Sequence, residues 1–278
     1  MGWSWVGLLP FFLFCTAFMF LPVAFLVVGS LHDTTGATSL QNYADLSTGS
    51  IPIAFRNSIE ISLVTAIAGG LFGLLLAWSV VMGRLPRFLR TGLMTFSGVA
   101  SNFAGVPLAL AFTFALGQAG FATVLLKNVG IEIYPGFRLT TTTGLELVYL
   151  YFQFPLMVLI IAPALEGLRR EWREAAENMG ASAGQYWRHI ALPILTPSIL
   201  GTMILLFGNS FGAQATAYQL TGGTLNIVTL VISSQIRGDV LHNPGLGYAV
   251  AMGMVAIMGV SILLYSILQR RAERWLRG

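Results

Sequence analysis

Six long hydrophobic runs, separated by polar stretches, dominate the pattern of this chain. Each run is long enough for a membrane-spanning helix, which needs about 20 apolar residues. We expect the spans at about residues 6–28, 57–82, 93–116, 144–165, 194–217 and 247–268. A further run, residues 225–236, is too short to cross, so we expect it to lie at the membrane surface or to dip into it.

The composition fits a membrane protein built of helices. Hydrophobic residues make up 55% of the 278 residues, charged residues make up 9%, and the mean hydropathy is +0.76. A soluble domain carries about 25% charged residues. We therefore predict an all-α integral membrane protein with six transmembrane helices. The one cysteine, Cys15, cannot form an internal disulfide, and the dispersed arginines do not indicate a nucleic-acid partner.

Basic residues support six spans rather than seven, and they orient the chain. With six spans, both termini lie on one side, together with residues 84–90 and 166–192. Of the 15 lysines and arginines, those on the other side are Arg56, Lys127, Arg138 and Arg237. The rest are Arg84, Arg87, Arg90, Arg169, Arg170, Arg173, Arg188, Arg270, Arg271, Arg274 and Arg277. Because short cytoplasmic connections carry an excess of basic residues, we expect both termini in the cytoplasm.

The longest charged connection, residues 166–193, reads EGLRREWREAAENMGASAGQYWRHIALP. Residues 166–179 fit a helix with one apolar face. The side chains on that face are Leu168, Trp172, Ala175, Ala176 and Met179. Gly180 can end the helix in the left-handed conformation that suits glycine.

A second short helix is expected directly after Gly180. Ser182 and Gln185 have the spacing of a capping box, which opens a helix. Pro193 disfavours a helical conformation at Leu192 and is expected to turn the chain into the membrane. The pattern favours two short helices with a sharp corner. The alternative is a solvated loop whose arginines only fix the topology.

This segment resembles the signature loop of binding-protein-dependent transport permeases, the membrane subunits of type I ABC importers. The pattern is E-A-A, a glycine four residues after the second alanine, and I-x-L-P ten residues later. The matching residues are Glu174, Ala175, Ala176, Gly180, Ile190, Leu192 and Pro193. The six-span layout and the segments NYADL and RNSIEIS extend the resemblance over about residues 40–268.

The resemblance implies a single permease domain, residues 1–278, with a core at 54–268 and a coupling loop at 166–193. The loop would seat in a cleft of a cytoplasmic ATPase, where small alanines allow close approach and Glu174 meets a basic group. ATPase closure would then reorient the spans. The implied coupling residues are Trp172, Glu174, Ala175, Ala176, Met179, Gly180, Ala181 and Ser182.

The resemblance also implies partners. These are two copies of the ATPase, a second and different permease subunit, an extracytoplasmic solute-binding protein and the bilayer of a bacterial inner membrane. The chain has no G-x-x-x-x-G-K-[ST] phosphate loop, so ATP and Mg would be bound by the ATPase. The chain itself would bind no cofactor and would not be an enzyme. His32, His189 and His242 lie far apart, with no second ligand at metal spacing.

Polar side chains inside the spans are candidates for the substrate path, since such groups are costly in a bilayer. The candidates are Asn102, Tyr149, Gln153, Asn209, Ser210 and Gln214. Asn102 precedes Pro107, which predicts a broken or kinked third span. Asn209 and Gln214 are expected on one helix. The alternative is that all these side chains make helix–helix hydrogen bonds.

The substrate is suggested only by resemblance. The segments FQFPLMVLIIAPALEGL and FGNSFGAQATAYQLTGG look like those of polyamine importers, so spermidine or putrescine is the first choice. Related branches take ferric iron, thiamine, phosphonates or opines. Two other classes stay open: an ion-driven secondary transporter, for which discontinuous helices and inverted repeats are expected, and a scaffold without transport.

Overall fold

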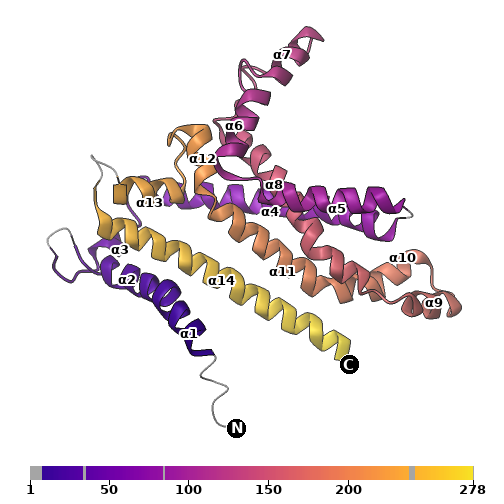
Figure 1. Cartoon of the computed structure of the whole chain (residues 1–278). Helices are drawn as coiled ribbons and strands as arrows, with labels where there is room; N and C mark the ends of the chain where they lie inside the picture. The colour runs from indigo at the N-terminus through magenta and orange to yellow at the C-terminus, as the bar shows by residue number, and fades with distance from the viewer. Residues whose placement is uncertain (1–7, 34–35, 84, 238–241, 278) are drawn as a thin grey trace. The chain divides into compact units, whose positions relative to one another are not determined.

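The computed structural model describes residues 8–33, 36–83, 85–237 and 242–277, without the side chains of 271–277. Val6, Arg84 and the side chains of Arg271, Arg274 and Arg277 therefore lie outside the described residues. Within these ranges the protein is helical, and the isolated bridge between His32 and Thr38 is the one β pairing (Figure 1). The prediction of an all-α fold is confirmed.

Six helices are long and apolar enough to cross a membrane, as predicted. They are Leu9–Ser30, Ile51–Met82, Gly105–Asn128, Thr142–Glu166, Ala183–Phe211 and Pro244–Arg270. The first comprises α1 (Leu9–Cys15), a π-helical turn (Thr16–Phe20) and α2 (Leu21–Ser30), with a proline in the first turn of α2. Local π geometry lets a spanning helix tolerate proline. The protein is thus a multi-pass membrane protein.

One compact unit comprises residues 1–56 and 226–258. In it, Asn42 of α3 (Gln41–Asp45) fastens the turn after α2, because its Nδ2 donates to the carbonyls of Ser30 at 3.0 Å and His32 at 2.8 Å. An apolar core joins the starts of α4 (Ile51–Met82) and α14 (Pro244–Arg277) to α13 (Val228–Arg237). Its buried members are Ile51, Ala54, Val228 and Val250.

Residues 228–236 of the short run at 225–236 are helical and belong to α13. Its position at or in the membrane surface stays a prediction.

The other unit comprises residues 57–225 and 259–278. Its buried centre is α8 (Thr142–Glu166), against which α4 packs through small residues. A Cβ at Gly69 would lie 2.7 Å from the Gln153 Cβ, and one at Gly73 would lie 2.5 Å from the Met157 Cβ. Only glycine allows this approach, so α4 and α8 pack closely at these two positions.

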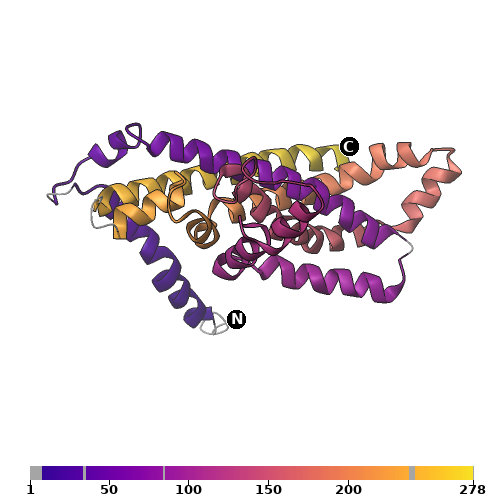
Figure 2. The ribbon, with the colours of Figure 1, turned by 90° about the horizontal axis from the view of Figure 1, so that it is seen from above.

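Two further features of this unit position the candidate sites. α5 (Arg87–Asn102) lies along α8, and α6 (Gly105–Leu116) lies along α12 (Gln214–Thr221). Figures 1 and 2 both show α9 (Arg170–Asn178) and α10 (Ala183–Tyr186) extending beyond the ends of α8 and α11 (Leu192–Phe211). The charged connection that contains α9 and α10 thus projects from the spanning helices.

Candidate functional site

The first candidate region is a helical corner formed by residues 170–191. Its first helix, α9, is followed by Gly180, which has a φ of +79°. The N–H of Ala181 donates to the Ala176 carbonyl at 2.9 Å, and the N–H of Gly180 closes a second bond to the last turn at 2.9 Å. These two bonds form a Schellman motif, which needs a left-handed residue. The prediction for Gly180 is confirmed.

The second arm of the corner begins with a capping box, as predicted. Ser182 Oγ accepts the N–H of Gln185 at 3.3 Å, and Gln185 Oε1 accepts the N–H of Ser182 at 2.7 Å. This exchange satisfies two backbone donors that the helix itself leaves unpaired, and α10 follows.

Pro193 does not end this helix, so that prediction is wrong. Leu192 is helical, with φ −61° and ψ −46°, and its N–H bonds to the Trp187 carbonyl in a π-helical turn. Pro193 then occupies the first turn of α11. The π-helical turn changes the hydrogen-bond register just before the residue that lacks an N–H. The chain is one continuous helix from Ala183 to Phe211.

The start of the corner also differs from the prediction of one helix over residues 166–179. α8 ends at Glu166 and α9 begins at Arg170. Gly167 caps α8, and Arg169 is extended, with φ −68° and ψ 136°. Glycine has a low helix propensity, which favours an interruption here. Glu166 forms an ion pair with Arg90 of α5 instead of lying on α9.

A small apolar core holds the two arms together. Ala176, Tyr186 and Ala191 are 1%, 6% and 0% exposed, and neighbouring apolar side chains pack against them. The two alanines of E-A-A therefore differ: Ala176 is packed inside the corner, whereas Ala175 is exposed. Close approach to a partner is available to Ala175, and the small size of Ala176 is explained by the corner itself.

The outer face of the corner carries exposed apolar and charged side chains. Met179 is 79% exposed, and the Arg169 guanidinium lies 5.8 Å from the centre of the Trp172 ring. Glu174 pairs with Arg170 at 2.8 Å along exposed α9, and a second such pair, Arg173 with Glu177, follows at 2.8 Å. Exposed pairs of this spacing contribute only about 0.3–0.5 kcal/mol, so a partner could replace them at small cost.

The second candidate region is a double break, residues 103–105 and 212–213, where two helices are interrupted. In the first, Ala104 is extended, with φ −138° and ψ −175°, and Gly105 has a φ of +72°. This confirms a broken third span. Pro107 lies in the first turn of α6, where its missing N–H removes no helical bond.

The predicted limits of the third span, 93–116, are wrong. α5 ends at Asn102, and the spanning segment begins only at Gly105. It continues into α7 (Phe121–Asn128).

The second interruption overturns the predicted fifth span, 194–217. α11 ends at Phe211, Gly212 caps it, and α12 is a separate helix from Gln214. Asn209 and Gln214 therefore lie on different helices, contrary to the prediction. The conformation is held by a distant contact, since the Tyr149 hydroxyl donates to the carbonyl of Ala213, the residue directly before α12.

Threonine 216 fastens the two interruptions to each other. The Gly105 N–H donates to Thr216 Oγ1 at 2.8 Å, and that hydroxyl lies 3.3 Å from the Gly105 carbonyl. The N-cap residues of α6 and α12, Ala104 and Ala213, form no cap with their own side chains, and both helices begin at this contact. The N-termini of α6 and α12 therefore lie side by side. Each helix N-terminus carries a partial positive charge, so two such charges lie close together here. The sequence marks Thr216 only as one polar residue of the fifth span, and it gives no sign of Gly105 or of the contact between them.

The six residues predicted for the substrate path fall into two groups. Three are buried and bonded between helices: Tyr149 to Ala213, Gln153 Nε2 to the Leu206 carbonyl at 2.8 Å, and Ser210 Oγ with Thr65 Oγ1 at 2.9 Å. These fit helix–helix hydrogen bonding. Asn102 and Asn209 are exposed and Gln214 is half-buried, so a place on the substrate path stays a prediction for these three.

Six spanning helices with this corner define the transmembrane domain of an ABC importer. The chain belongs to the family described as binding-protein-dependent transport system inner membrane component, which matches residues 69–278. It is 28% identical over 274 residues to the sulfate transport system permease protein CysT of Salmonella typhimurium, with coverage of 96% of this chain and 92% of the relative. It is 26% identical over 275 residues to the spermidine/putrescine transport system permease protein PotB of Haemophilus influenzae, with 97% and 93% covered.

Solved structures share the fold. A bacterial ABC transporter involved in the import of the acidic polysaccharide alginate matches with a TM-score of 0.75 and 17% identity, covering 96% of this chain and 94% of that chain. The MetNI methionine ABC transporter matches with a TM-score of 0.53 and 15% identity, covering 81% and 99%. Discontinuous helices therefore do not indicate an ion-driven secondary transporter here, since the family match assigns the chain to ABC importers.

Proposed function

We propose that this chain is the non-catalytic permease subunit of an ATP-driven importer, and that it docks a cytoplasmic ATPase through the helical corner. The observation that carries the proposal is the corner itself. It is a packed two-helix projection at the family motif, and its tip exposes Glu174 and Met179. Partner ATPases would bind ATP and Mg. This chain supplies the surface that their closure moves.

The geometry supports a mechanism in which one helix links docking to transport. The segment Ala183–Phe211 has 29 residues, begins inside the corner and ends at Gly212 of the double break. At about 1.5 Å per residue, such a helix is long enough to connect the corner to the double break. A movement of the corner would therefore shift the end of α11, where Gly212 and Ala213 can change conformation. Asn102, Asn209 and Gln214 near the interruptions would line the path.

The partners follow from the same role. One chain offers six spans and one corner, so we infer a pair of permeases, two ATPases and an extracytoplasmic solute-binding protein, with both termini in the cytoplasm. A solved structure of similar fold is a bacterial alginate ABC transporter in complex with an alginate pentasaccharide-bound periplasmic protein. We favour two different permeases, as the sequence predicts.

Two observations favour an oxyanion such as sulfate as the substrate. Several relatives are named sulfate permeases, including those of Salmonella typhimurium and Escherichia coli, each 28% identical. In addition, the N-termini of α6 and α12 meet at the double break, and their partial positive charge would stabilise a negative charge. The second candidate is a polyamine, supported by the 26% identity to PotB.

Uptake into proteoliposomes tests both parts of this proposal. The assembled transporter, with ATP inside and the binding protein outside, should accumulate radiolabelled sulfate, and unlabelled spermidine should not compete. Accumulation of spermidine instead would transfer the substrate assignment to polyamines. Uptake that continues without ATP and stops with a protonophore would contradict the importer role.

A further inference from the structure

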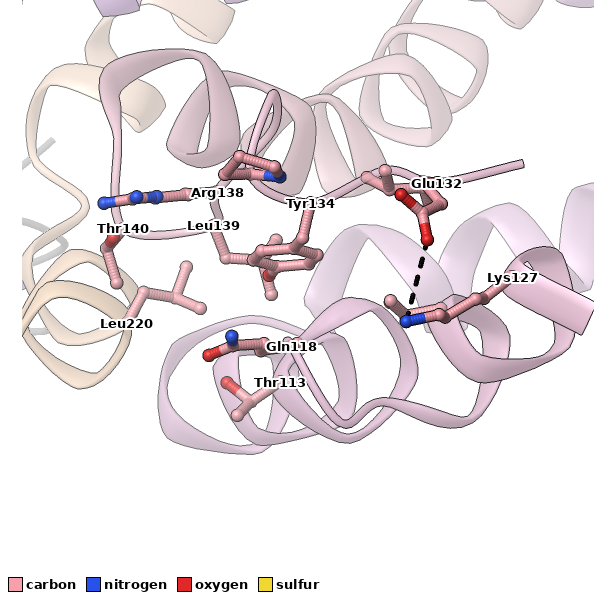
Figure 3. Close-up of a pocket in the computed structure, with 13 residues that line it drawn as sticks. Thr113, Gln118, Lys127, Glu132, Tyr134, Arg138, Leu139, Thr140 and Leu220 are labelled. Carbon is pink, nitrogen blue, oxygen red and sulfur yellow. Dashed lines mark ion pairs between the residues drawn. The ribbon is translucent and has the colours of Figure 1, made fainter. Parts of the chain in front are cut away.

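A cavity of about 800 Å³ opens at the far ends of α6 and α12, away from the double break. Its lower wall in Figure 3 carries Thr113 and Gln118, and its opposite wall carries Tyr134 and Arg138. Thr123, in the first turn of α7, also lines it. Cavities of about 300–1,000 Å³ are typical of small-molecule sites. All of these residues belong to one compact unit.

The cavity has an excess of positive charge. Lys127 and Glu132 pair at 3.6 Å at one end and neutralise each other. Arg138 lines the other side, and among the described residues it forms no ion pair. A guanidinium offers several N–H donors in a planar fork that matches an oxyanion.

Thr123 provides an independent sign of a missing ligand. It is only 7% exposed, and its Oγ1 has no hydrogen-bond partner in the described part of the chain. A buried hydroxyl without a partner is costly, so such a group usually meets a ligand or a water. Thr123 is the third residue of α7, whose N-terminus has no side-chain cap. The hydroxyl, the backbone donors of that turn and Arg138 all suit a negatively charged acceptor.

We propose that this cavity binds a small oxyanion, either sulfate or an organic carboxylate such as citrate. Arg138 supplies the charge, Thr123 and the first turn of α7 supply hydrogen bonds, and the Gln118 amide lies across the cavity from Arg138. In the proposed topology the cavity faces the extracytoplasmic side, so it would hold an anion before the anion reaches the double break. The role of the cavity in import rests on the proposed function. The binding itself does not, because binding can be measured without transport.

Binding of radiolabelled sulfate to the full chain in lipid nanodiscs is the test. Sulfate should bind saturably, citrate should compete, and spermidine should not. Arg138→Gln should weaken binding by at least about tenfold, because a charge-assisted bidentate contact is lost. Arg138→Lys should retain more of the affinity than Arg138→Gln. Arg237→Gln, the same change far from the cavity in sequence and outside this unit, should bind like the wild type.

Thr123→Val separates a ligand-binding hydroxyl from a structural one. The substitution should weaken sulfate binding by about tenfold, yet it should not lower the melting temperature without anion, because it removes an unpaired buried hydroxyl. Thr123→Ser should restore the affinity. If Arg138→Gln fails to fold, the two Thr123 variants decide the question.

The proposal is wrong if the wild type binds neither sulfate nor citrate, or if Thr123→Val binds sulfate like the wild type. Saturable binding that needs Thr123 and Arg138 in a transporter that fails to take up sulfate would leave this site standing. It would overturn only the proposed substrate.

Discussion

The helical corner and the double break both interrupt helices, but different contacts hold them. At the corner, Gly180 and the capping box of Ser182 bond within a few residues along the chain. At the double break, Gly105 bonds to Thr216, which is 111 positions away. A turn made by local contacts can be read from local sequence. A turn made by distant contacts needs the packed structure, so the corner should resist changes elsewhere and the double break should not.

The largest effect is expected from Gly180→Val. A β-branched residue at a φ of +79° is strained by about 1–2 kcal/mol or more, although an added Cβ would meet nothing within 4 Å. The corner would change shape, and co-purification of the ATPase should fall at least about tenfold. Gly184→Ala is the matched control, because its Cβ would also enter open space in an ordinary helical position. Equal recovery of the ATPase with both variants would contradict the claim that the left-handed backbone at Gly180 is needed for docking.

Thr216→Val should act next most strongly, through the double break. It leaves the Gly105 N–H without its partner, which costs about 1–3 kcal/mol of the free energy of unfolding. Thr202→Val is the control, because Thr202 is equally buried at 2% but bonds only to the Ser198 carbonyl in its own helix. Thermal unfolding should show the larger loss in Thr216→Val, and uptake should follow it. Similar losses in both variants would contradict the special role of the contact between the two interruptions.

Glu174→Lys tests whether the exposed face of the corner contacts the ATPase through this carboxylate. Glu174 and Glu177 each form an exposed pair at 2.8 Å, so reversing either charge should change stability by less than about 0.5 kcal/mol. If Glu174 is the carboxylate that faces the ATPase, its reversal should reduce ATP-driven uptake several-fold, whereas Glu177→Lys should reduce it less. Uptake by both variants is the measurement. A larger loss of uptake in Glu177→Lys would show that the ATPase contacts Glu177 rather than Glu174.

The smallest effect is expected from Asn209→Leu at the end of α11. Asn209 is exposed, so leucine should cost no packing and should favour the helix. Assembly with the ATPase should be unchanged, and the apparent affinity for substrate should fall a few-fold. Ser210→Ala, one residue on, removes the bond to Thr65 and should lower stability instead. Wild-type uptake by Asn209→Leu would exclude this side chain from the path.

Local patterns account for what could be predicted from the sequence. Hydrophobic run length is sufficient for the number of spans but not for the limits of the third and fifth, and glycine and serine spacing is sufficient for the Schellman motif and the capping box. A rule about one residue, such as the rule that proline interrupts a helix, is wrong where a neighbouring turn compensates for the missing N–H. Pro193 was expected to end a helix, but the π-helical turn at Trp187–Ala191 lets the helix continue.

The double break was only half visible in the sequence. Pro107 predicts the interruption of the third span. The sequence around Gly212 does not reveal that Tyr149 bonds to Ala213 or that Gly105 bonds to Thr216. The apolar run through residues 194–217 therefore looked like one helix. Polarity alone also could not separate exposed Asn209 from buried Ser210, because exposure depends on which helices pack around them.

The central claim is that one helix carries movement from the helical corner to the double break. Cys15 is the only cysteine, so Cys15→Ser with Asn209→Cys gives a single reporter thiol at the end of α11. The rate at which a water-soluble maleimide modifies that thiol should change when the assembled transporter receives ATP. Adding Glu174→Lys should abolish the change while the ATP-free rate stays the same. An ATP-dependent change that survives Glu174→Lys, or no change with the corner intact, would contradict the account.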